Sequence, residues 1–123
     1  MNKNTKVSEF RLKLYPNDFH SVRNFYENTL GYTVIKEWNK GEDDLGVMFD
    51  TGTAILELLS PANEYLPIQG VGLSLEVIDV KALREELDGK VTITRDIRHT
   101  NWGDTAFTVS DPEGFKITFF TRD

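Results

Sequence analysis

The most constraining feature of this sequence is that the order of its elements in the first half is repeated in the second. A Leu-x-Leu pair ends four residues before Asp18, and a second such pair ends four residues before Asp79. The run Leu56-Glu57-Leu58-Leu59 likewise corresponds to Ile117-Thr118-Phe119-Phe120. Either half alone would bury too little apolar surface, so we expect the two halves to build one fold together.

The first half predicts a strand, a helix and three further strands. Residues 10–15 alternate apolar and polar, which is typical of a strand with two different faces. Asp18 can cap a helix that ends near Gly31, because its apolar residues follow helical spacing. The further strands are predicted at 32–38, 46–49 and 53–59, and the acidic run Glu42-Asp43-Asp44 is interpreted as a solvated hairpin loop rather than a calcium site.

The second half predicts the same order of elements. A strand at 71–77 is followed by a helix capped by Asp79, and further strands are predicted at 91–94, 105–109 and 116–120. Residues 96–103 are predicted to be a loop. The sequence Asp111-Pro112-Glu113-Gly114 predicts the turn that joins the last two strands, since proline and glycine fit its backbone angles.

The expected fold class is α+β, with two tandem βαβββ modules forming a concave mixed sheet that bears a cleft. Residues 1–123 form one domain, with module one at about 8–60 and module two at about 70–122. If the leucines of the repeat pack under the helices, strand alternation turns their neighbours toward the cleft. The predicted cleft residues are Arg11, Lys13, Tyr15, Ile55, Glu57, Leu59, Gly72, Ser74, Glu76, Lys116, Thr118 and Phe120.

Composition restricts the partners and the chemistry. Twenty acidic against fourteen basic residues give a net charge of −6, which argues against nucleic acid and anionic membranes and mildly favours a cationic ligand. The absence of cysteine removes thiolate chemistry and leaves His, Asp and Glu as metal ligands. No apolar stretch reaches the ~20 residues of a membrane span, and the polar start of the chain has no secretory signal, so a cytoplasmic location is expected.

The chain resembles the vicinal oxygen chelate superfamily, which includes glyoxalase I, extradiol dioxygenases and bleomycin-binding resistance proteins. The resemblance extends over nearly the whole chain and implies the glyoxalase/bleomycin-resistance fold and a homodimer. It is carried by Asp18, Phe25-Tyr26, Leu30-Gly31-Tyr32, Leu56-Glu57-Leu58, Val77-Ile78-Asp79-Val80, Trp102-Gly103 and Asp111-Pro112-Glu113-Gly114.

The same resemblance implies where a metal would be held. Metal-dependent members place four ligands on cleft-facing strands, and these positions correspond here to Arg11, Gly72, Glu57 and Thr118. A single good oxygen ligand without histidine does not compete with water for a transition metal. We therefore expect no metal and no other cofactor. His20 and His99 lack ligand spacing and are expected to be solvated or to form hydrogen bonds.

Arg11 and Glu57 are predicted to form an ion pair at the vacant metal position, because an unpaired buried charge is costly. Arg11 could supply positive charge to a ligand carboxylate, carbonyl or phosphate, and the alternative is a purely structural ion pair. Tyr15, Trp38 and Trp102 could stack on a flat ligand, or could be core or dimer contacts. Ser74 and Thr118 complete the predicted ligand-binding set.

Three functions remain open from the sequence. The leading hypothesis is a metal-independent protein that sequesters a small compound, such as an antibiotic or another aromatic or cationic molecule. The alternative is a lyase- or dioxygenase-like enzyme that uses Glu57 as a catalytic base or metal ligand, and an enzyme would resemble glyoxalase as a lyase or isomerase. The third is a regulatory or structural module without a small ligand.

Overall fold

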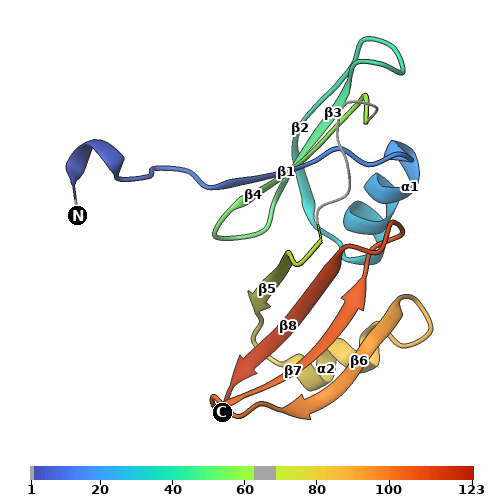
Figure 1. Cartoon of the computed structure of the whole chain (residues 1–123). Helices are drawn as coiled ribbons and strands as arrows, with labels where there is room; N and C mark the ends of the chain where they lie inside the picture. Colours follow the sequence, from blue (N-terminus) through green and yellow to red (C-terminus); the bar gives the residue numbers. More distant parts are fainter. Residues whose placement is uncertain (1, 63–68) are drawn as a thin grey trace. The chain divides into compact units, whose positions relative to one another are not determined.

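The computed structural model describes residues 2–62 and 69–123. The chain divides into two compact units, residues 1–66 and 67–123, and each contains a four-stranded sheet with one helical segment against it (Figure 1).

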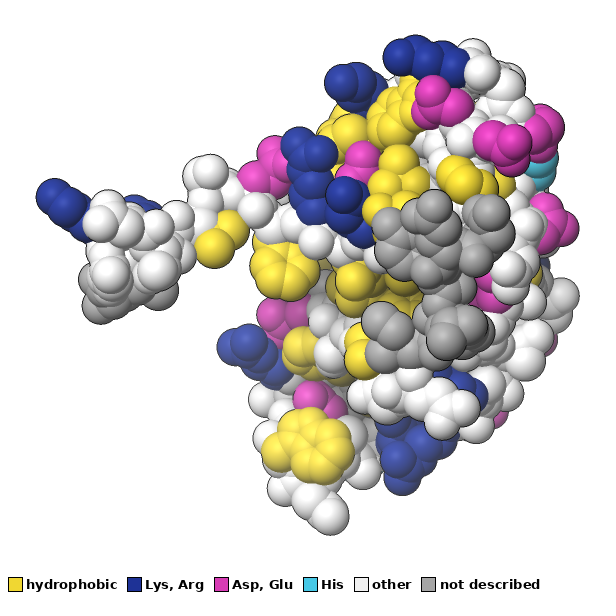
Figure 2. Space-filling model, turned by 45° about the horizontal axis from the view of Figure 1, so that its top comes forward, with side chains coloured by type: hydrophobic (Ala, Val, Ile, Leu, Met, Phe, Trp, Pro, Cys, Tyr) yellow, Lys and Arg dark blue, Asp and Glu magenta, His cyan; other side chains and the backbone are white. Residues whose placement is uncertain are grey.

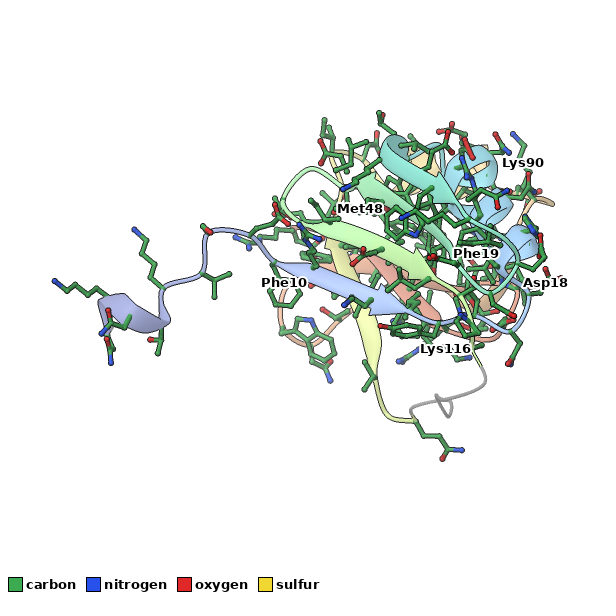
Figure 3. The ribbon with its side chains drawn as sticks, turned by 90° about the horizontal axis from the view of Figure 1, so that it is seen from above. Phe10, Asp18, Phe19, Met48, Lys90 and Lys116 are labelled. Carbon is green, nitrogen blue, oxygen red and sulfur yellow. The ribbon has the colours of Figure 1, made fainter. Side chains whose placement is uncertain are left out.

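The first unit has the predicted order of strand, helix and three strands. Its sheet has the strand order β1-β4-β3-β2, in which β1 is parallel to β4 and the other pairs are antiparallel. A short 3₁₀ helix, Lys3–Thr5, lies in the N-terminal segment, which leads away from β1 (Figure 3). The elements are β1 Arg11–Leu14, α1 Phe19–Asn24 continued by a π-helical turn Phe25–Thr29, β2 Thr33–Asn39, β3 Leu45–Asp50 and β4 Ile55–Leu59.

The second unit repeats this topology. Its sheet has the order β5-β8-β7-β6, with β5 parallel to β8 and the other pairs antiparallel. The repeat predicted from the leucine pairs is therefore confirmed at the level of strand order. The elements are β5 Gly72–Glu76, α2 Val80–Glu86, β6 Thr92–His99, β7 Asp104–Ser110 and β8 Lys116–Arg122.

Each unit has an apolar core between its helix and one face of its sheet. In the first unit, Phe49 and Leu56 are register partners, both are almost fully buried, and the ring of Tyr26 lies 6.4 Å from that of Phe49. In the second unit, Phe107 pairs with Phe119 at a ring distance of 5.5 Å. Strand alternation then turns the residues between these core positions to the opposite side of each sheet.

An ion pair between helix and outer strand also recurs. In the first unit, Arg23 of α1 contacts Glu37 of β2 at 2.5 Å and Glu27 at 3.0 Å. In the second, Arg84 of α2 contacts Asp96 of β6 at 2.8 Å and Asp88 at 2.9 Å. Glu37 on the edge strand β2 and Asp96 on the edge strand β6 thus each form an ion pair with an arginine of the helix in the same unit.

Predicted caps and turns are confirmed. The side chain of Asp18 accepts a hydrogen bond from the backbone of Ser21 at 3.1 Å, and that of Asp79 accepts one from Ala82 at 3.0 Å. At the predicted turn, Asp111 accepts from two backbone N–H groups and Gly114 has a φ of 85°, which favours glycine.

One predicted loop is wrong. Residues 96–99 belong to β6, which extends to His99, so the connection to β7 is short. The pairing register shifts twice, between Ile93 and Arg95 and again before Arg98. Extra residues at such bulges remove the period-2 pattern that reveals a strand, which explains the error. No helix in the described part of the chain has the length and apolar character needed to cross a membrane.

The cap at Asp79 can be tested by mutation. We expect Asp79→Ala to lower the free energy of unfolding by about 1 kcal/mol, because the Ala82 amide loses its side-chain partner. Asp79→Ser should stay near the wild-type value, since a serine hydroxyl also caps. Urea denaturation would measure both variants, and equal destabilisation by the two would contradict the capping role.

Candidate functional site

Most of the predicted site residues lie on the side of each sheet that is opposite its helix, here named the helix-distal face. On the first sheet, one row across the strands consists of Lys13, Glu57, Met48 and Lys36, which are successive register partners on β1, β4, β3 and β2. Arg11 occupies the neighbouring row beside Ile55. Figure 2 shows basic, acidic and apolar side chains close together over the first unit.

Glu57 is a buried carboxylate in a basic setting. It is only 6% exposed, and an Arg11 guanidinium nitrogen lies 4.0 Å from its Oε1. Arg11 also forms a close ion pair with Glu9, and its hydrogen bond to that carboxylate raises the pKa of the guanidinium. The predicted ion pair of Arg11 with Glu57 is therefore present. Glu9 lies nearer to Arg11 than Glu57 does, and the sequence did not indicate this second partner.

The indole of Trp38 packs over the backbone of Gly46 on the same face, and this position is here named the seat of Trp38. It is the register partner of Gly46, and a Cβ atom placed on Gly46 would lie 1.9 Å from Cζ2 of the indole. Glycine is therefore required here because the ring occupies the space above its backbone. The ammonium of Lys36 lies 6.0 Å from the centroid of the ring, within the range of a cation–π contact.

The helix-distal face of the second sheet carries hydroxyl groups in the corresponding row. Ser74 of β5 pairs with Thr118 of β8, and Thr118 pairs with Thr108 of β7. The Thr108 and Thr118 hydroxyl oxygens are 2.8 Å apart. The Arg98 guanidinium, from the segment predicted as a loop, donates to the Thr108 hydroxyl at 3.3 Å.

The remaining predicted residues lie apart from these rows. Tyr15 follows β1 and is half-buried, whereas Trp102 lies in the turn between β6 and β7 and is 77% exposed. His20 lies 3.3 Å from a Glu42 oxygen. His99 lies 3.0 Å from the Thr105 hydroxyl, as the expected hydrogen-bonding role requires.

The four positions equivalent to the family's metal ligands do not provide a matching donor set. Gly72 has no side chain, Arg11 carries a cation, and the Thr118 hydroxyl is engaged with Thr108. Glu57 is the one carboxylate among them, beside the Arg11 guanidinium. Within residues 2–62 and 69–123, no group of three or more His, Asp or Glu side chains could hold an ion.

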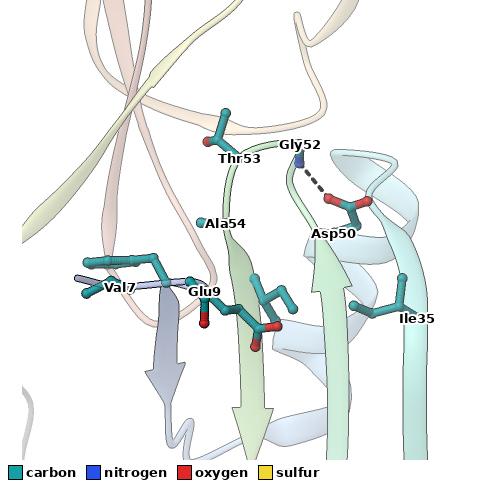
Figure 4. Close-up of a pocket in the computed structure, with 10 residues that line it drawn as sticks. Val7, Glu9, Ile35, Asp50, Gly52, Thr53 and Ala54 are labelled. Carbon is teal, nitrogen blue, oxygen red and sulfur yellow. Dashed lines mark hydrogen bonds between the residues drawn. The ribbon is translucent and has the colours of Figure 1, made fainter. Parts of the chain in front are cut away.

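A shallow pocket of about 490 Å³ lies at another place in the first unit (Figure 4). It is formed by residues 7–10 together with Ile35 and the turn between β3 and β4. Within it, the Gly52 amide donates to Asp50 Oδ1 at 2.7 Å, which closes the turn. Glu57, Trp38 and Arg11 do not line the pocket, although its lining includes Ile55, a predicted cleft residue, and Glu9, an ion-pair partner of Arg11.

Solved structures with the same fold include proteins of different kinds, and the three described next are each under 25% identical to this chain. A superfamily member from Sphaerobacter thermophilus DSM 20745 has a TM-score of 0.79 and 21% identity, over 95% of this chain and 98% of that chain. TnmS3, an antibiotic binding protein from Streptomyces sp. CB03234, has a TM-score of 0.79 and 20% identity, over 97% and 98%. A lactoylglutathione lyase from Agrobacterium tumefaciens has a TM-score of 0.69 and 15% identity, over 94% of each chain.

No curated protein matches the sequence significantly. The family model of the Glyoxalase/Bleomycin resistance protein/Dioxygenase superfamily matches residues 10–119, which include α1, α2 and all strands except the end of β8. The family resemblance found in the sequence and the two repeated four-stranded sheets agree with this match. The chain therefore belongs to the Glyoxalase/Bleomycin resistance protein/Dioxygenase superfamily.

Proposed function

We propose that this chain is a small-molecule binding protein that sequesters a compound containing an aromatic ring and that works without a metal. The observation that carries the proposal is the seat of Trp38, whose indole covers Gly46 on the helix-distal face of the first sheet. An indole held over glycine offers a flat apolar surface for stacking. TnmS3, which shares the fold, is an antibiotic binding protein, so the fold also occurs in a protein that binds a small molecule.

The donor set supports metal independence. Binding of a transition metal needs three or four convergent donors, whereas Glu57 lies beside a guanidinium and Thr118 beside a second hydroxyl. The predicted contact residues Arg11, Glu57, Ser74, Thr118, Tyr15, Trp38 and Trp102 remain part of the proposal, as do the homodimer and the cytoplasmic location. A cationic compound, predicted from the net charge of the whole chain, stays an alternative within this proposal.

An enzyme is the second candidate, favoured by the burial of Glu57. A carboxylate that is 6% exposed beside a guanidinium could accept a proton from a bound substrate while Arg11 stabilises developing negative charge. The solved lactoylglutathione lyase shows that the fold also occurs in an enzyme. The two candidates differ in whether the bound compound is converted.

The first test is titration with a panel of aromatic natural-product antibiotics, followed by tryptophan fluorescence. We expect saturable quenching by at least one compound, with the same affinity before and after dialysis against EDTA, because no metal bridges protein and ligand. Elemental analysis of protein purified without chelators should find no stoichiometric metal. A bound divalent ion whose removal abolishes binding would contradict metal independence.

The seat of Trp38 can be tested at Gly46. In a Trp102→Phe background, where Trp38 is the only tryptophan, Gly46→Ala should displace the indole and shift its emission to longer wavelength. We expect affinity for the aromatic compound to fall about threefold to tenfold, the size of one lost aromatic contact. Unchanged emission and affinity would show that the ring does not depend on this glycine.

Conversion of the ligand separates the two candidates. We expect the compound recovered after prolonged incubation to be chemically intact by mass spectrometry, for the wild type and for Glu57→Gln alike. If instead a product forms and Glu57→Gln slows it by roughly 10²- to 10⁴-fold, Glu57 is a catalytic base and the protein is an enzyme.

A further inference from the structure

Arg98 is held on the helix-distal face of the second sheet. Its register partner on β7 is Ala106, on the same face as Thr108 and Thr118. The bulge before Arg98 sets this orientation, since it shifts the register between Arg95 and Arg98. The residue is half-buried, and its guanidinium donates to the Thr108 hydroxyl at 3.3 Å and to the Asp96 backbone carbonyl at 3.4 Å.

Within the described residues, Arg98 and Arg95 form no ion pair with a carboxylate, unlike the four other arginines, which include Arg23. Arg11 is paired with Glu9 and Glu57, Arg84 with Asp88 and Asp96, and Arg122 with Glu76 at 3.1 Å. Among the described residues, no carboxylate lies within 4.0 Å of the Arg98 guanidinium. Burial and then the positive charge of Arg95 lower the pKa of Arg98, although Asp104 acts in the opposite direction. The site therefore holds positive charge that protein carboxylates do not neutralise at close range.

The Thr108 and Thr118 hydroxyl groups beside Arg98 can act as further hydrogen-bond donors. Arg98 donates to the oxygen of Thr108, so the Thr108 hydroxyl hydrogen is free to point to Thr118, 2.8 Å away. Thr118, once it accepts this bond, can direct its own hydrogen away from Thr108 to a ligand. Such a chain of hydrogen bonds polarises in one direction, and a guanidinium with five N–H donors keeps several for an incoming oxyanion.

The wider charge distribution points the same way. Although the whole chain has a net charge of −6, register-paired positions on the two helix-distal faces carry more basic than acidic side chains. The basic ones are Arg11, Lys13, Lys36, Arg95, Arg98, Lys116 and Arg122, and the acidic ones are Asp50, Glu57, Glu76 and Asp104.

We propose that Arg98, with Thr118 and Thr108, forms an oxyanion subsite on the second sheet that binds a carboxylate or phosphate group. The inference rests on the proposed function, since it names the chemical class of the compound that is bound. Guanidinium groups bind both oxyanions through charge-assisted hydrogen bonds, which are stronger than neutral ones.

The test uses four small aromatic probes of similar size: benzoate, phenyl phosphate, benzyl alcohol and phenyltrimethylammonium. Each is titrated into the ¹⁵N-labelled full chain while the Arg98 Nε–H and Thr118 amide signals are followed by NMR. We expect saturable shifts at both signals with one or both anions, and none with the alcohol or the cation. The relative affinities of benzoate and phenyl phosphate then decide between carboxylate and phosphate.

Three variants test the assignment. Arg98→Gln should weaken anion binding at least tenfold, and Thr118→Val should weaken it several-fold. Lys90→Gln removes one positive charge from an exposed turn and should leave the affinity unchanged. The amide spectrum of each variant shows whether the fold is retained. Equal shifts by the cation, no saturation at Arg98, or unchanged affinity in Arg98→Gln would overturn the subsite.

The outcomes also separate this inference from the proposed function. An aromatic compound whose binding depends on Gly46 but is indifferent to Arg98→Gln would overturn the oxyanion subsite and leave sequestration intact. Conversion of a bound acid that still requires Arg98 would overturn sequestration and leave the subsite intact.

Discussion

Parallel pairing of the first and last strands in each unit is the constraint on which the candidate site depends. It sets Lys13 beside Glu57 in the first sheet and Ser74 beside Thr118 in the second. A shift of one residue would turn Glu57 into the apolar core, where its charge would have no water. The leucines that pack under the helices fix this register, so the core determines which polar groups face the other side.

Much of the fold could be predicted because its signals are local and repeated. The capping aspartates, the leucine pairs and the turn at Asp111 each act through neighbouring residues, and the structure has them as predicted. The extension of β6 could not be predicted, since bulges around Arg95 remove the alternation of the strand. Arg98 was missed for the same reason. Residues 96–103 were predicted to be a loop, and the face of a sheet on which a side chain lies can be predicted only for a strand.

The predicted ion pair of Arg11 with Glu57 is present, whereas the second partner of Arg11, Glu9, was not predicted. The pair of Arg11 with Glu57 follows from adjacent parallel strands, and the two lie 4.0 Å apart. Glu9 lies before β1 and not in a strand, so strand register could not predict that it also binds Arg11. The seat of Trp38 was likewise hidden, because it requires knowing that Gly46 lies opposite the indole.

The acidic side chains are unevenly placed, so the net charge of the whole chain does not describe the charge of each face. Glu37 and Asp96 lie on the outer strands but are held by arginines of the helices. On the opposite faces the two sheets differ, with Glu57 and Met48 in one row matched by Thr118 and Thr108 in the other. These differences do not affect the core, because the core residues lie at alternate strand positions that face the helix. The two units therefore share one strand order and present different side chains on their helix-distal faces.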